Sequence, residues 1–183
     1  MTLVWHNREA SAAAAPLGLR GHDLDVVVAV VRLRVAGVLQ RMDQALEVGC
    51  GSGERARLLA PYFSEYLAVD GDEVAVERAR RDSAGLRLRG LRFEVADGPP
   101  PGASTRDFVL YDFARDGSRA SVRGRIAAVT EDLAPGGVAL LVLPHRRGPA
   151  WPTVANAARS QGGRIAWIDR SSGAGRLYCI SRS

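Results

Sequence analysis

Four short apolar segments of this chain share one feature: each ends in residues that could bind a ligand. In chain order they are residues 45–48 before the glycine-rich loop 49–53, residues 66–69 before Asp70, residues 91–95 before Asp97, and residues 108–111 before Asp112. If the segments are parallel strands, their carboxyl ends lie at one edge of a sheet, where open α/β sheets bind ligands. A glycine loop and three carboxylates at one edge predict a binding site.

The types and spacing of these residues predict a nucleoside with a charged tail. Gly49 and Gly51 have no side chain, so the backbone can turn tightly and approach a ligand closely. The helix expected after the loop presents free N–H groups that attract an anionic group. Asp70 lies 21 positions after Gly49, a spacing at which an acid can accept hydrogen bonds from both ribose hydroxyls. Asp97, followed by Gly98, can accept from an exocyclic amine such as that of adenine.

Two common nucleotide-binding motifs do not fit this loop. In the dinucleotide fingerprint Gly-x-Gly-x-x-Gly/Ala the third small residue comes one position later than Gly53, and here Glu54 occupies that position. A carboxylate beside a pyrophosphate is unfavourable, which counts against NAD and FAD. All 25 residues counted as lysine or arginine are arginine, and the P-loop requires a lysine, so that class is excluded.

The rest of the chain supplies the elements that must position this edge. Strands are predicted at residues 45–48, 66–69, 91–95, 108–111 and 138–143, followed by a hairpin of residues 164–168 and 176–180. Helices are predicted at residues 23–41, 54–60, 73–82, 119–133 and 153–161, with Asp23 as the cap of the first. This alternation predicts an α/β fold with a doubly wound, mostly parallel sheet whose last strand is antiparallel.

Length and composition limit the class of protein. The 183 residues correspond to one domain, which we expect at residues 21–183 behind an N-terminal arm at residues 1–20. Hydrophobic residues make up 46% and charged residues 25%, as in soluble globular chains, and no apolar run is long enough to cross a membrane. The two cysteines lack the spacing of a metal site, so no metal is expected. Without a secretory signal, they are consistent with a cytoplasmic protein.

The net charge of +5 has two interpretations. A basic protein can bind the phosphates of nucleic acid. Here the arginines are scattered along the chain, and aromatic residues, which total 6%, do not alternate with them. We therefore favour a bias of the genome toward arginine codons.

Taken together, the motifs resemble those of the class I S-adenosylmethionine (SAM)-dependent methyltransferases. Residues 46–53 (LEVGCGSG) resemble the first motif, residues 67–70 (LAVD) the second, and residues 93–97 (FEVAD) the segment that holds adenine. Residues 108–112 (FVLYD) and 133–138 (LAPGGV) resemble the fourth strand and the turn into the fifth. The resemblance covers residues 40–183 and implies a Rossmann-like, seven-stranded sheet with an antiparallel last strand.

The resemblance also implies a role for each motif residue. Glu47 would interact with the ammonium group of SAM, directly or through a water. The backbone of Gly49 and Gly51 would line the methionyl part of the cofactor. Asp70 would hold the ribose, and Asp97 would accept from the adenine amine. Methyl transfer would convert SAM to S-adenosylhomocysteine (SAH).

The adenine subsite and the fourth strand depart from the family pattern. The backbone of Gly98 or Ala96 would lie at the edge of the adenine ring, and Gly71 stands where family members usually place an apolar residue against the ring. The glycine weakens stacking or leaves room for another side chain, such as Val74. The Asn/Asp-Pro-Pro-aromatic motif of many amino-methylating members is absent, since residues 111–114 read YDFA. Methylation of adenine N6 or of glutamine is therefore disfavoured.

Methyl transfer to a hydroxyl or a protonated amine needs a group that removes a proton. Asp112 and Tyr111 end the fourth predicted strand, where the methyl group would lie. His145 follows the fifth predicted strand and is the histidine nearest to the same edge. We take Asp112 first and His145 second as candidate catalytic residues.

Three functions remain open at this stage. The first is a methyltransferase acting on an oxygen or nitrogen of a small-molecule acceptor, in secondary metabolism and in the cytoplasm. The second is the same fold acting on RNA or protein, and the third is a SAM-binding module or partner subunit that transfers no methyl group. No membrane contact is expected, nucleic acid is a less favoured partner, and a homodimer is left open.

Overall fold

The computed structural model describes residues 21–100, 106–113, 121–143, 151–169 and 176–182. The strands are β1 Gln44–Val48, β2 Glu65–Asp70, β3 Leu91–Val95, β4 Arg106–Asp112, β5 Leu133–Leu143, β6 Gly163–Asp169 and β7 Arg176–Arg182. The helices are α2 Gly21–Val35, α3 Glu54–Leu59, the 3-10 helix η2 Ala60–Tyr62, α4 Glu73–Ser83, α5 Val122–Asp132 and α6 Trp151–Arg159. The arm expected at residues 1–20 lies outside the described residues.

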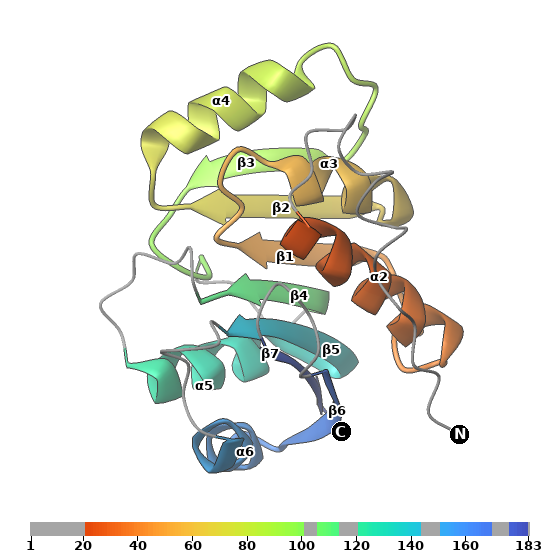
Figure 1. Ribbon diagram of the computed structural model, residues 1–183, viewed down its shortest axis with the longest axis vertical. Helices are drawn as coiled ribbons and strands as arrows, with labels where there is room; N and C mark the ends of the chain where they lie inside the picture. The colour runs from red at the N-terminus through yellow and green to blue at the C-terminus, as the bar shows by residue number, and fades with distance from the viewer. Residues whose placement is uncertain (1–20, 101–105, 114–120, 144–150, 170–175, 183) are drawn as a thin grey trace.

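The strands form one seven-stranded sheet in the order β3-β2-β1-β4-β5-β7-β6 (Figure 1). Strands β1 to β5 run parallel to one another, and β7 lies antiparallel between β5 and β6. The predicted α/β fold with an antiparallel last strand is confirmed. The strand order reverses between β1 and β4, and the carboxyl ends at such a switch point are where doubly wound folds bind ligands.

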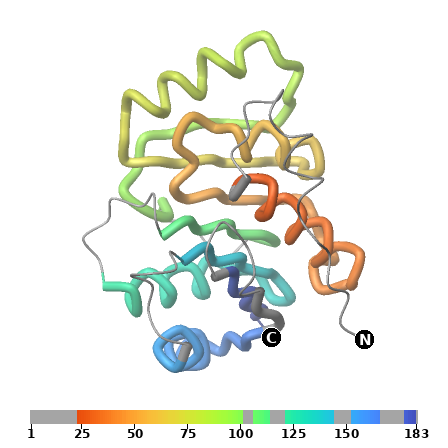
Figure 2. Tube along the Cα trace, in the orientation of Figure 1, coloured from red at the N-terminus to blue at the C-terminus, as the bar shows by residue number. Residues whose placement is uncertain are grey.

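The two faces of the sheet are covered by different helices, as the chain trace in Figure 2 shows. Apolar side chains of α2, α3 and α4 pack on one face, against alternate residues of the strands such as Ala45 and Leu110. Side chains of α5 and α6 pack on the other face, against residues such as Leu46 and Val109. Because successive side chains of a strand point to opposite faces, position along each strand decides which layer a residue joins.

Helix α2 ends earlier than the sequence pattern predicts. We expected it to reach residue 41, but it ends at Val35. Gly37 adopts a left-handed φ of 69°, and the N–H of Val38 donates to the carbonyl of Leu33 at 3.0 Å. This is the glycine C-terminal motif that closes many helices, and Gly37 was its signal. Asp23 is also not the cap, because it lies inside the first turn of α2.

Strand β5 begins at Leu133, where the sequence predicts the end of a helix and a turn before residue 138. Leu133 pairs with Arg106, and Val138 then pairs with Phe108, so the intervening residues form an irregularity in the strand. A Cβ on Gly137 would lie 2.7 Å from the carbonyl oxygen of Arg106, closer than ordinary contact. Gly137 therefore allows the two backbones to approach at this irregularity.

Candidate functional site

The glycine loop leaves β1 at the switch point of the sheet. Gly49, Gly51 and Gly53 have φ values of 81°, 54° and 78°, in the left-handed region that favours glycine. The N–H groups of Gly49 and Cys50 donate to the carbonyl of Val69 at 2.9 and 3.0 Å. These bonds fix the start of the loop against the end of the neighbouring strand β2.

Asp70, the last residue of β2, binds the next part of the loop. Its Oδ2 accepts a hydrogen bond from the N–H of Gly51 at 2.7 Å, and its Oδ1 accepts one from the N–H of Asp72 at 3.0 Å. The residue is 6% exposed. Each carboxylate oxygen has a further lone pair, so the contacts leave acceptor capacity for ribose hydroxyls. The predicted ribose contact of Asp70 stays a prediction.

The side chain of Asp97 accounts for the presence of glycine at position 71. A Cβ on Gly71 would lie 2.3 Å from Oδ1 of Asp97, far inside van der Waals contact. The Asp97 carboxylate thus fills the space in which we expected an apolar side chain against adenine. Val74 does not fill it, since 77% of Val74 is exposed. The neighbouring Gly98 has a φ of 138°, which favours glycine there.

Glu47 and Asp112 lie at the same edge, and both contact one buried arginine, Arg55 of α3. The Nε of Arg55 donates to Oε1 of Glu47 at 3.0 Å, and its Nη1 donates to Oδ2 of Asp112 at 2.7 Å. Its Nη2 donates to the carbonyl of Gly49 at 2.9 Å. Asp23 of α2 completes the group, with its Oδ1 3.7 Å from Nε of Arg55.

The side chains of this cluster are removed from solvent. The side chains of Arg55 and Glu47 are 0% exposed, that of Asp112 is 3% exposed and that of Asp23 is 2% exposed. Tyr66 of β2 is buried as well, and its hydroxyl donates to Oε2 of Glu47 at 2.9 Å. We call Asp23, Glu47, Arg55, Tyr66 and Asp112 the Arg55 cluster.

Electrostatics keep the donors of the cluster protonated. Burial by itself lowers the pKa of Arg55, but the carboxylates of Glu47 and Asp112 outweigh it, and the net shift is upward. Burial and the charge of Glu47 raise the pKa of Tyr66 well above its usual value. Arg55 is therefore a permanent cation, and Tyr66 a permanent hydrogen-bond donor.

The two predicted catalytic residues have different outcomes. Asp112 lies at the carboxyl end of β4, as predicted, but one of its oxygens is engaged by Arg55. Tyr111 points to the opposite face of the sheet, is fully buried and packs against Phe113 at a ring-centroid distance of 4.6 Å. Its side chain therefore lies on the face of the sheet opposite to that of Asp112. His145 lies outside the described residues.

Arg55 is not among the site residues that the sequence predicts. The signal was its position four residues before Leu59, on the face of α3 that also carries Ala56 and is buried. An arginine at a buried position requires anionic partners, and the acids at the strand ends supply them. Which acids meet it depends on the order of the strands.

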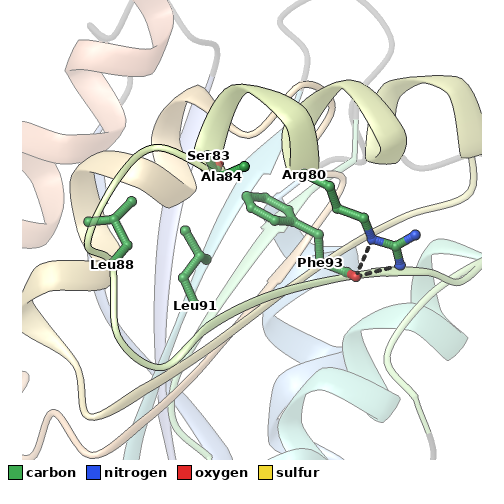
Figure 3. Close-up of a pocket in the computed structure, with 6 residues that line it drawn as sticks. All are labelled: Arg80, Ser83, Ala84, Leu88, Leu91 and Phe93. Atoms are coloured by element: carbon green, nitrogen blue, oxygen red, sulfur yellow. Dashed lines mark hydrogen bonds between the residues drawn. The ribbon is translucent and has the colours of Figure 1, made fainter.

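A separate cavity of about 220 Å³ lies between α4 and β3. Its lining residues are Arg80, Ser83, Ala84, Leu88, Leu91 and Phe93 (Figure 3). The Nε and Nη2 of Arg80 donate to the carbonyl of Phe93 at 3.1 and 2.7 Å. The cavity is smaller than the roughly 300–1,000 Å³ of typical ligand sites, and it does not include the glycine loop or the acids at the strand ends.

The described part of the chain contains no group of three or more His, Cys, Asp or Glu residues arranged to hold a metal ion. None of its helices combines the length and the apolar character needed to cross a membrane. Cys50 and Cys179 are free thiols, and both are buried.

Known protein families identify the family of this chain. The methyltransferase domain family matches residues 45–137, the segment that carries the glycine loop, Asp70, Asp97 and Asp112. The chain belongs to the class I SAM-dependent methyltransferases. The cofactor of this family is SAM.

Relatives of this chain include two proteins named protein-L-isoaspartate O-methyltransferase. The one from Cellvibrio japonicus is 32% identical over 140 residues, which are 75% of this chain and 59% of the relative. The one from Aromatoleum aromaticum is 29% identical over 132 residues, which are 71% of this chain and 57% of the relative. The match thus spans little more than half the length of these relatives.

Solved structures share the fold of this chain at low sequence identity. Magnesium protoporphyrin IX methyltransferase from Synechocystis PCC 6803 superposes with a TM-score of 0.72 at 19% identity, covering 89% of this chain and 80% of the other. An amino pentose methyltransferase from Micromonospora echinaspora superposes with a TM-score of 0.70 at 18% identity, covering 100% and 99% of the two chains. Both likenesses concern the fold.

Proposed function

We propose that the chain is a SAM-dependent methyltransferase that transfers a methyl group to an oxygen or nitrogen of a small-molecule acceptor. One observation carries the proposal: the glycine loop, Asp70 and Asp97 lie together along the carboxyl edge of the sheet, next to its switch point. Gly71 leaves a space that an added Cβ would fill, and the Asp97 carboxylate occupies it. The left-handed glycine loop and the remaining acceptor capacity of Asp70 fit the close backbone approach and the hydroxyl donors of a nucleoside cofactor.

When bound, SAM supplies an electrophilic methyl carbon on a sulfonium centre. The contribution of the chain is to hold the cofactor and acceptor in line and to exclude water. Asp70 would accept from the ribose hydroxyls, Asp97 from the adenine amine, and the loop at Gly49 and Gly51 would line the methionyl part. Asp112 ends β4 at the same edge, but its side chain is 3% exposed and bonded to Arg55, which suits a supporting role rather than removal of a proton from the acceptor.

The cysteines favour an oxygen or nitrogen as the acceptor atom. Such an atom attacks with its own lone pair, whereas a ring carbon is commonly activated by a nucleophile such as a thiolate. The sequence has two cysteines, and both are buried. Burial raises the pKa of Cys179 to about 12 and moves that of Cys50 upward even further. Neither thiol therefore supplies a thiolate near neutral pH.

The described surface favours a small acceptor over RNA. Several exposed arginines are paired with acids: Arg41 with Asp107, Arg78 with Asp82, Arg80 with Glu77, and Arg92 with Glu65. Among the large hydrophobic residues that are exposed in the described part of the chain, Tyr62 is the one aromatic. Proteins that bind single-stranded RNA use aromatic platforms beside unpaired basic groups.

A second candidate acceptor is a carboxylate oxygen of a peptide. The names of the two relatives favour it, since both are protein-L-isoaspartate O-methyltransferases. A carboxylate is already anionic, so its methylation requires no proton removal. That requirement agrees with an Asp112 whose oxygen is engaged by Arg55.

Calorimetric titration with SAM and SAH tests the cofactor half of the proposal, with Asp70→Ala as the matched variant. We expect micromolar binding that the substitution abolishes. Absence of binding to both ligands would overturn the proposal. Formation of SAH is then followed with a set of small hydroxyl and amine acceptors and with an isoaspartyl peptide. Turnover with the peptide alone would replace the small-molecule proposal by the second candidate.

A further inference from the structure

We propose that Arg55 is a positioning residue through which acids of two strands fix the methionyl end of the cofactor subsite. The inference rests on the proposed function, since it assumes that SAM lies against the glycine loop. Arg55 is a buried cation outside the family motifs. In this role it links the glycine loop to Asp112, the acid at the end of β4 that the sequence predicts as a catalytic group.

The contacts of Arg55 join parts of the chain that are distant in sequence. On the cofactor side, its Nη2 holds the carbonyl of Gly49 and its Nε holds Oε1 of Glu47. On the other side, its Nη1 holds Oδ2 of Asp112 at the end of β4. Asp23 approaches Nε from α2 at 3.7 Å. One side chain thus connects α2, β1, the glycine loop and β4.

The chemistry of the side chain suits this linking role. A guanidinium is planar and presents five donors in a fixed fork, so it can hold several acceptors at set angles. The ammonium of a lysine is a point charge on a flexible stem and cannot reproduce that geometry. Charge-assisted hydrogen bonds such as those to Glu47 and Asp112 are roughly twice as strong as neutral ones.

The position of Gly49 makes this contact functionally relevant. Gly49 has a left-handed φ of 81°, and glycine by itself is the least restrained residue. Its N–H is held by Val69 and its carbonyl by Arg55, so both sides of this peptide segment are fixed. Glu47 is held in turn by Arg55 and by the hydroxyl of Tyr66. Two of the groups expected beside the methionyl part, Glu47 and the backbone of Gly49, are therefore positioned by Arg55.

The test compares ligands that differ in the methionyl tail. SAM and SAH carry the amino-acid tail, whereas 5′-methylthioadenosine has the same nucleoside without it. We expect Arg55→Lys to raise the Kd of SAM and of SAH about tenfold or more and to change the Kd of 5′-methylthioadenosine less than about twofold. Arg78→Lys, the same substitution at an exposed arginine of α4, is the control and should change none of the three.

A purely structural role of Arg55 gives a different result. General loosening of the domain would weaken all three ligands to the same degree, and that outcome, or unchanged binding of all three, overturns the inference. Failure of the wild-type protein to bind SAM would instead overturn the proposed function. Calorimetric titration gives the Kd values, and thermal unfolding shows that each variant is folded at the titration temperature.

A second experiment keeps the inference testable if Arg55→Lys does not fold. Glu47→Gln and Asp112→Asn keep the size of each side chain, and they lie on neighbouring strands on either side of Arg55. If Arg55 links them, the changes that the two substitutions cause in the binding free energy of SAM should not add in the double variant. Additive effects would show that Asp112 acts independently of the methionyl subsite and would overturn the link.

Discussion

Substitution of Gly71 by alanine separates the binding role of Asp97 from stability. The φ of Gly71 is not in the left-handed region, so alanine can adopt its backbone conformation. The new Cβ would lie 2.3 Å from Oδ1 of Asp97, whereas ordinary contact begins at 3.4 Å, so the carboxylate must move by about 1 Å. Because Asp97 is exposed, its side chain can move at little cost. We expect the free energy of unfolding to change by less than about 1 kcal/mol.

Cofactor binding should respond more strongly than stability. A displacement of about 1 Å takes a hydrogen bond of roughly 2.9 Å beyond the range in which it is effective. A hydrogen bond to a charged group contributes about 1.5–3 kcal/mol, and the exposure of Asp97 puts its contribution at the lower end of that range. A loss of about 1.5 kcal/mol corresponds to a roughly tenfold increase in the Kd of SAM.

Calorimetric titration of Gly71→Ala with SAM measures this increase. Gly85→Ala is the matched control, because no atom lies within 4 Å of an added Cβ at that position. In an Asp97→Ala background, Gly71→Ala should have no further effect. An unchanged Kd in the single variant, or a further tenfold loss in the double variant, would refute the assignment of Asp97 to the cofactor subsite.

The remaining predictions concern stability and reactivity. Gly53→Ala places a Cβ 2.7 Å from the ring of Phe93, at a position whose backbone is left-handed. Urea unfolding should therefore show that the free energy of unfolding falls by about 2–4 kcal/mol. An unchanged midpoint would contradict this packing. Burial raises the pKa of Cys50 above its usual range, so an aromatic disulfide reagent at pH 8 should modify neither cysteine until urea is added; rapid labelling of the native protein would disprove their burial. Burial raises the pKa of Asp132 and outweighs the charge of Arg106, which disfavours the folded state as pH rises through that pKa. Asp132→Asn should therefore raise the Tm at pH 7 and lose this advantage below about pH 4, whereas a lower Tm at pH 7 would mean that the ion pair dominates.

Most of the strands could be predicted from local patterns, because a buried strand is a short apolar run between turn residues. The predictions failed where one local signal overrode another. Gly37 ended α2 before the apolar periodicity did. The irregularity at Gly137 let β5 begin at Leu133 inside a segment whose glycines and proline are typical of a turn.

The candidate site also has some features that the sequence predicts and others that only the fold decides. The sequence by itself determined the glycine loop and the acids at the ends of β2, β3 and β4, because the carboxyl ends of parallel strands share an edge whatever their order. It also indicated that Gly71 departs from the family pattern. The reason for that departure, the carboxylate of Asp97 in the space of a Cβ, appeared only in three dimensions.

The partners of Arg55 were decided by the tertiary structure alone. Asp23, Glu47 and Asp112 lie 32, 8 and 57 positions from Arg55 in the sequence, and no local pattern relates them. They meet because β1 and β4 are neighbours at the switch point and because Glu47 and Asp112 point to the face that α2 and α3 cover. Contacts of this range depend on strand order and on which face each side chain takes, and both are properties of the assembled sheet.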